Sequence, residues 1–322
     1  MNVYAPALAK TRRIDDETSS FALDVIDGLS PHPKHLPPKY FYDAAGSELF
    51  EQITRLPEYY PTRTELSILR DRGQAIAAVI PQGAALVEFG AGATTKIRLL
   101  LQNCTLGAYV PVDISGDFVK AQAEALRQDF PALAVYPVAA DFTAPFVLPA
   151  EIADMPKVGF FPGSTIGNFE PHEACALLRS AREILGHNAQ MVIGVDLEKD
   201  ERVLHRAYND AAGVTARFNL NLLDRINREL RGNFDTSKFR HLASYNPERH
   251  RIEMHLISTK AQKVRVLDRS FSFGAGESIH TENSYKYNIE RFTALANGSG
   301  WTCGKSWTDA EHMFSVHALV AG

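Results

Sequence analysis

The chain has 322 residues, of which 45% are hydrophobic and 22% are charged, and its formal net charge is −4. This composition is that of a globular protein with a proper core, built as one large domain or two moderate ones. The acidic pI near 6.3 and the lack of a basic cluster interleaved with aromatic residues argue against nucleic acid or an anionic membrane as partner. A small molecule is the expected partner.

Three scattered cysteines, Cys104, Cys175 and Cys303, lack any C-x-x-C spacing, so the sequence suggests neither a disulfide framework nor a zinc site. The 11 histidines show no spacing of metal ligands. No apolar stretch approaches the length of a membrane helix, and the first 20 residues lack the apolar core of a signal peptide. We expect a cytoplasmic monomer without a bound metal.

The first 60 residues are rich in proline and tyrosine and do not follow a sheet pattern. From residue 62, apolar runs alternate with amphipathic segments, which is typical of a mainly parallel sheet covered on both faces. The fold class is therefore α/β. Helices are expected at 64–80, 116–130 and 171–186, and strands at 85–89, 108–114, 133–141, 157–163 and 189–197.

Beyond residue 197 the pattern changes. A long helical region at 200–230 precedes a β-rich stretch at 250–274, and the chain ends with one more helix and two strands. The middle segment reads as an insertion that packs with the N-terminal segment. We expect one domain from 62–197 and 287–322, and a second, substrate-binding or lid domain from 1–61 and 198–286.

A glycine pair, Gly90 and Gly92, follows the predicted strand 85–89. Glycine here allows a sharp turn and a close approach of the backbone to a ligand or to the next helix. A dinucleotide fingerprint would carry a third glycine where this chain has Thr95. The loop alone leaves open a nicotinamide or flavin cofactor, another nucleotide-like cofactor, or a plain turn.

Carboxylates stand at the ends of the neighbouring strands, where an open α/β sheet binds its ligands. Asp113 lies 23 residues after Gly90, which is close to the spacing of about 20 residues at which an acidic residue binds a ribose diol. Asp141 can accept from an adenine amino group with Phe142 against the ring, and Lys96 can pair with a carboxylate of the ligand. Acidic residues around a nucleoside fit a cationic ligand such as S-adenosylmethionine better than a pyrophosphate, although Asp113 by itself could equally be a helix cap.

Long motifs in a fixed order resemble one family, the S-adenosylmethionine-dependent L-histidine Nα-methyltransferases of ergothioneine biosynthesis. The resemblance covers nearly the whole chain. It is densest in "LPPKYFYDAAGSELFEQITRLPEYYPTRTE", "EFGAGATTK", "FPGSTIGNF", "AYNDAAGVTARFNLNLL", "RIEMHL" and "TENSYKY". It implies a Rossmann-like methyltransferase domain with a second domain, an antiparallel closing strand, and three successive methylations of the histidine α-amine to give hercynine.

The resemblance also implies a role for each matched residue. Tyr42, Gly163 and Thr165 would lie at the reacting amine and the amino acid backbone. The cofactor S-adenosylmethionine would contact Gly90, Lys96, Asp113, Asp141 and Phe142. The substrate would contact Tyr59, Asn168, Tyr208, Met254, Glu282 and Ser284.

Residue patterns alone also allow purely structural roles for these residues. The three tyrosines could be packing residues, Met254 follows ordinary inward strand patterning, and Glu282 in "TENSYKY" would be a solvated loop residue. Competing functions are methylation of another amino acid such as tryptophan, a nicotinamide-dependent oxidoreductase, and a noncatalytic S-adenosylmethionine-binding regulator. Within the resemblance, Glu282 becomes the main specificity residue.

Overall fold

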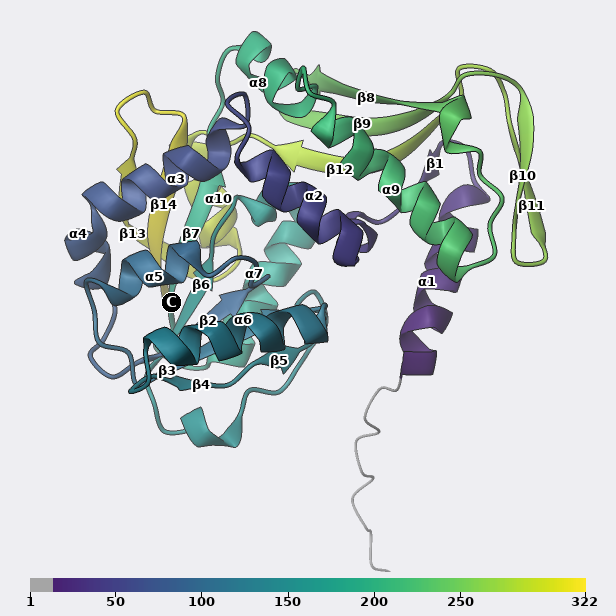
Figure 1. Cartoon of the computed structure of the whole chain (residues 1–322). Coiled ribbons are helices and arrows are strands. Elements are labelled where there is room, and N and C mark those ends of the chain that lie inside the picture. The colour runs from purple at the N-terminus through teal and green to yellow at the C-terminus, as the bar shows by residue number, and fades with distance from the viewer. Residues whose placement is uncertain (1–13) are drawn as a thin grey trace, which may run out of the picture.

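The computed structural model describes residues 14–322, with side chains described from Ser20 onward. The first 13 residues lie outside the described residues. The expectation that the chain begins without a signal peptide concerns this segment. Figure 1 shows the arrangement of the elements. The helices are α1 Ile14–Leu29, α2 Ala44–Thr54, α3 Tyr60–Asp71, α4 Gly73–Ala77, α5 Thr95–Leu101, α6 Gly116–Asp129, α7 Pro171–Leu185, α8 Glu201–Tyr208, α9 Val214–Glu229 and α10 Ile289–Gly298. The strands are β1 Lys34–His35, β2 Ala85–Phe89, β3 Ala108–Asp113, β4 Ala134–Val135, β5 Val138–Ala139, β6 Lys157–Phe161, β7 Gln190–Asp196, β8 Phe239–Asn246, β9 Arg251–Ser258, β10 Gln262–Val266, β11 Arg269–Phe273, β12 Ser278–Tyr285, β13 Trp301–Thr308 and β14 Phe314–Ala321.

An eight-stranded sheet in the order β13-β14-β7-β6-β2-β3-β4, with β5 also paired to β3, forms the larger layer of the described chain. Strands β2, β3, β6 and β7 pair in parallel, whereas β14 runs antiparallel to β7. The order reverses between β2 and β6, so the carboxyl ends of these strands open a crevice where ligands bind in such sheets. The expected Rossmann-like α/β fold with an antiparallel closing strand is confirmed.

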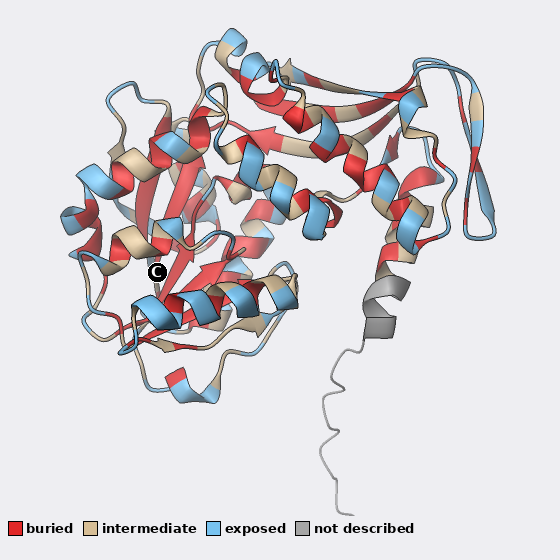
Figure 2. Ribbon diagram, in the orientation of Figure 1, coloured by how far each residue is buried: buried red, intermediate tan, exposed pale blue. Residues whose placement is uncertain are grey.

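Helices cover both faces of this sheet because successive strand residues point to opposite sides. Val87 and Phe89 pack with α7 and α10, whereas Leu86 packs with α3, α5 and α6. Figure 2 shows the strands buried between helices whose outer faces are exposed. No helix in the described part of the chain is long and apolar enough to cross a bilayer.

Two expected elements are interrupted. The strand expected at 133–141 is two short strands, β4 and β5. Pro137 lies between them and Pro111 lies in β3, and because proline has no N–H, the ladder between the two segments loses donors. The helix expected at 64–80 ends at Asp71 and resumes as α4, with Arg72 outside helical geometry.

A second, four-stranded sheet has the order β1-β12-β9-β8. The N-terminal segment supplies β1, and the chain beyond residue 238 supplies the other three strands. Helices α1, α2 and α9 pack on one side of this sheet around a hydrophobic cluster that includes Phe41, Phe218, Leu222 and Met254. Strand β8 lies before the predicted β-rich stretch, which begins only at residue 250, and was not predicted.

A β-bulge interrupts the pairing of β12 with β9. His280 pairs with His255 and Glu282 pairs with Met254, so Thr281 is the extra residue. A bulge inserts one residue and changes which face the following side chains point to. Glu282 therefore shares the face of Met254, while His280 stacks on His255 on the other face at 5.0 Å between ring centroids.

Candidate active site

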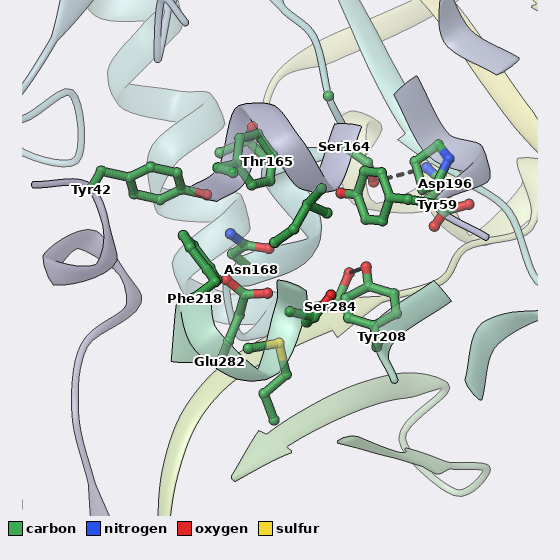
Figure 3. Close-up of a pocket in the computed structure, with 16 residues that line it drawn as sticks. Tyr42, Tyr59, Ser164, Thr165, Asn168, Asp196, Tyr208, Phe218, Glu282 and Ser284 are labelled. Atoms are coloured by element: carbon green, nitrogen blue, oxygen red, sulfur yellow. Dashed lines mark hydrogen bonds between the residues drawn. The ribbon is translucent and has the colours of Figure 1, made fainter. Parts of the chain in front are cut away.

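A pocket lies between the carboxyl ends of β6 and β7 and the inner face of the four-stranded sheet (Figure 3). All the residues that the resemblance assigned to the reacting amine and the substrate line it. These are Tyr42, Tyr59, Gly163, Thr165, Asn168, Tyr208, Met254, Glu282 and Ser284. They come from distant parts of the chain, and the fold brings them together.

The turn after β6 forms the floor of the pocket. Gly163 has φ +82° and Ser164 has φ +56°, so two successive residues take the left-handed conformation. The buried Glu65 carboxylate accepts the Gly163 N–H at 2.9 Å, and the same carboxylate lies 2.7 Å from the Lys96 ammonium. Glu65, which the sequence analysis did not select, thus ties the turn to α5.

Aromatic side chains form the wall made by the N-terminal segment. Tyr42 lies edge-on to Phe50 and Phe218, at 5.6 and 5.8 Å between ring centroids. Burial, followed by the nearby Glu282, raises the pKa of Tyr42 well above 10. The Tyr42 hydroxyl, which points into the pocket (Figure 3), therefore stays protonated and can both donate and accept.

Glu282 and Ser284 enter the pocket from β12. The expectation from residue patterns that Glu282 lies in a solvated loop is wrong, because the residue belongs to a paired strand. Burial raises the pKa of Glu282 to about 7, while the charge of Lys286 opposes this shift. Among the described residues, none donates a hydrogen bond to this carboxyl group, which leaves it available to a ligand.

A buried charged cluster closes the opposite side of the pocket. Asp196 at the end of β7 lies 2.6 Å from Lys199 and 2.8 Å from Lys286, and accepts from the Tyr60 hydroxyl at 2.7 Å. Burial opposes the ionisation of Asp196, but the charges of Lys199 and Lys286 outweigh it and lower the pKa of this carboxyl. No sequence motif predicted this cluster, although Asp196, a carboxylate at the end of the predicted strand 189–197, was a usable signal.

The residues expected at the cofactor lie at the adjoining strand ends. Gly90 has φ +74°, and a Cβ atom there would lie 3.3 Å from the Phe142 ring. Asp113 ends β3, and burial raises its pKa to about 6. Asp141 accepts from the Thr143 N–H at 2.9 Å.

This set fits a nucleoside with a positive charge. Asp113 and Asp141 lie at neighbouring strand ends, and the Phe142 ring lies against the glycine turn at Gly90. Lys96 in α5 pairs with Glu65 beside them. Lys96 also connects the two sets of residues, because a Cβ atom on Gly163 would lie 3.2 Å from its ammonium nitrogen. Across residues 20–322, no group of three or more His, Cys, Asp and Glu side chains is arranged to hold a metal ion.

The large sheet has the strand order and the antiparallel closing strand of a Rossmann-like methyltransferase, and carboxylates lie at the ends of its parallel strands. These features define the class of S-adenosylmethionine-dependent methyltransferases. The family model described as histidine-specific, SAM-dependent methyltransferase matches residues 21–321. The chain belongs to this family. The nicotinamide-dependent oxidoreductase considered from the glycine loop is thereby excluded.

Three relatives illustrate the similarity. The chain is 40% identical to the histidine N-alpha-methyltransferase of Mycolicibacterium smegmatis, over 98% of this chain and 99% of the relative. It is also 40% identical to the histidine N-alpha-methyltransferase of Mycobacterium tuberculosis, over 91% and 92%. Ergothioneine biosynthesis protein 1 of Neurospora crassa is 31% identical over 89% of this chain and 33% of that longer protein.

Proposed function

We propose that this protein transfers methyl groups from S-adenosylmethionine to the α-amine of L-histidine, producing the trimethylated betaine hercynine as a step of ergothioneine synthesis. Family membership and the two relatives at 40% identity support the reaction. The structural observation that carries the proposal is one pocket lined both by a carboxyl group, Glu282, and by the hydroxyl and amide groups of Tyr208 and Asn168.

These groups match the two ends of histidine. An imidazole has an N–H donor when neutral and two when protonated, so it can donate to the Glu282 carboxylate and to the Ser284 oxygen. The α-carboxylate can accept from the Asn168 amide and the Tyr208 hydroxyl. An apolar side chain in place of imidazole would leave Glu282 buried and unpaired, which rejects the analogue strongly.

The chain's own residues orient the amine for transfer. S-adenosylmethionine, when bound by Gly90, Lys96, Asp113, Asp141 and Phe142, supplies an electrophilic methyl group on a sulfonium. Methyl transfer needs an aligned, neutral amine rather than a strong base. The Tyr42 hydroxyl is protonated throughout the neutral range and holds an amine without a lasting ion pair, which suits successive methylations.

We further propose that residues 1–61 and 198–286 act as the substrate-binding domain and residues 62–197 and 287–322 as the methyltransferase domain. Support comes from the pocket, whose lining residues derive from both sheets and the segments that flank them. The three cysteines are free, which is consistent with action in the cytoplasm on a small-molecule substrate.

The reaction is tested by incubating the protein with S-adenosylmethionine and each of the twenty amino acids, with products identified by mass spectrometry. Histidine should yield mono-, di- and trimethylated products, the last accumulating. A preference for another amino acid, tryptophan included, would contradict the histidine assignment. Cofactor binding without any methylated product would instead support a regulator.

A further inference from the structure

Lys286 is a fully buried lysine directly after β12, with 0% of its side chain exposed. Burying an ammonium group is costly unless every charge and donor finds a partner. Its nitrogen lies 2.8 Å from Asp196 Oδ2, 2.7 Å from Ser284 Oγ and 3.0 Å from the Tyr208 hydroxyl oxygen. An ammonium group has three N–H donors, so these contacts use all of them.

These contacts constrain the hydroxyl groups of the pocket. Tyr208 and Ser284 are themselves 2.7 Å apart, and each accepts one hydrogen bond from Lys286. One hydroxyl hydrogen of the pair is used between them, and the other remains for a ligand. If Ser284 donates to Tyr208, then Tyr208 donates into the pocket and Ser284 keeps one lone pair for an N–H donor.

The same cluster sets the sign of the local charge. Lys286 and Lys199 both lie within 2.8 Å of Asp196, so two cations share one carboxylate. Burial lowers the pKa of Lys199 only to about 8, so this amine is charged at neutral pH. The Lys286 ammonium group therefore lies directly against the Tyr208 hydroxyl, and its charge is opposite in sign to that of the Glu282 carboxylate.

We propose that Lys286 is a positioning residue that makes this side of the pocket selective for the α-carboxylate of the amino acid substrate. It does so by occupying one lone pair on each of the Tyr208 and Ser284 oxygens, so that one hydroxyl hydrogen of the pair remains for the ligand, and by supplying the positive charge. The assignment rests on the proposed function, in which the carboxylate meets Asn168 and Tyr208.

The test compares L-histidine with L-histidinamide, whose terminal amide is neutral, in wild-type protein and in Lys286→Met. Hydrogen bonds involving a charged group are worth about tenfold or more in binding. Wild type should prefer histidine. In Lys286→Met, kcat/KM for histidine should fall by about tenfold or more, mainly through KM, whereas that for histidinamide should change less than about twofold. Calorimetry with S-adenosylhomocysteine present should show the same selective loss of histidine affinity.

Matched variants separate positioning from packing. Lys34→Met removes another buried lysine, 3% exposed and paired with Glu277 outside the pocket, and should leave the preference for histidine unchanged. Lys286→Arg, which keeps the charge, should restore part of the preference. Lys286→Met retains Lys199 and Tyr60 as partners of Asp196, and Lys286→Gln provides a second neutral variant that keeps one donor group.

Equal losses for histidine and histidinamide, or no loss for either, would overturn the assignment. Failure of both Lys286→Met and Lys286→Gln to fold, judged by circular dichroism, would also overturn it, because Lys286 would then serve folding. These results differ from a failure of the proposed function, in which wild type itself would not methylate histidine.

Discussion

Replacing Glu282 by glutamine should stabilise the unliganded protein at alkaline pH. Burial raises the pKa of Glu282 from 4.5 to about 7, and each pKa unit corresponds to about 1.4 kcal/mol. The folded protein therefore holds this proton more tightly than the unfolded chain. The stability that this gives is fully present below pH 4.5 and is lost as the pH rises through about 7, a loss of up to about 3 kcal/mol. Glutamine does not ionise and avoids the loss.

The assay is urea denaturation of wild type and Glu282→Gln at about pH 5 and about pH 8. The stability difference in favour of the variant should grow by about 2 to 3 kcal/mol between these values. Glu248→Gln, which alters an exposed glutamate, is the control and should show no such growth. A difference that stays constant with pH would refute the reasoning that an ionised Glu282 is poorly solvated in the empty pocket.

The same variant tests recognition of the imidazole. Histidine should raise the melting temperature of wild type, because a ligand that binds only the folded state stabilises it, and should do so much less in Glu282→Gln. In competition between equimolar histidine, phenylalanine and tryptophan, the variant should lose much of the preference for histidine. If the variant keeps the preference of the wild type for histidine, Glu282 does not recognise the imidazole ring.

Three further outcomes are expected. Asp113→Asn should weaken S-adenosylmethionine binding by about 1.5 to 3 kcal/mol in calorimetry. Because burial raises the pKa of Asp113 to about 6, the affinity of the wild type should fall as the pH drops through 6. An affinity that does not change with pH would contradict the role of Asp113. Gly163→Ala should lower kcat/KM for histidine, because alanine is strained at φ +82° and its Cβ would lie 3.2 Å from the Lys96 nitrogen. Unchanged kinetics would show that the turn can relax. Trp301→Ala should cost about 3 to 5 kcal/mol of unfolding free energy without changing substrate preference, since this side chain is 1% exposed and donates to the Leu178 carbonyl at 2.8 Å.

The strands of the large sheet follow from local sequence. Strands β2, β3, β6 and β7 are nearly continuous apolar runs, which only a sheet covered on both faces can bury. Once these strands are parallel, their carboxyl ends share one edge, and Asp113 and Gly163 must stand near one another. The fold class, and the sheet edge at which folds of this kind bind ligands, were therefore predictable from the residues themselves.

The substrate side was only partly predictable. Motif resemblance selected the residues of the pocket wall, but it missed Glu65, Asp196 and Lys286, whose roles depend on partners far away in sequence. Lys286 contacts Asp196 across about 90 residues of chain. An ion pair between residues so far apart in sequence produces no local periodicity, so a sequence pattern does not predict it.

The sequence by itself determined the alternation of helices and strands, the glycine turns and the carboxylates at the strand ends, because each depends on the conformational and solvation preferences of neighbouring residues. Only the tertiary structure decided which way the "TENSYKY" strand faces. Strict alternation would place His280 and Glu282 on one face, and the bulge at Thr281 separates them. That bulge arises from the register between β12 and β9, and it turns Glu282 into the pocket.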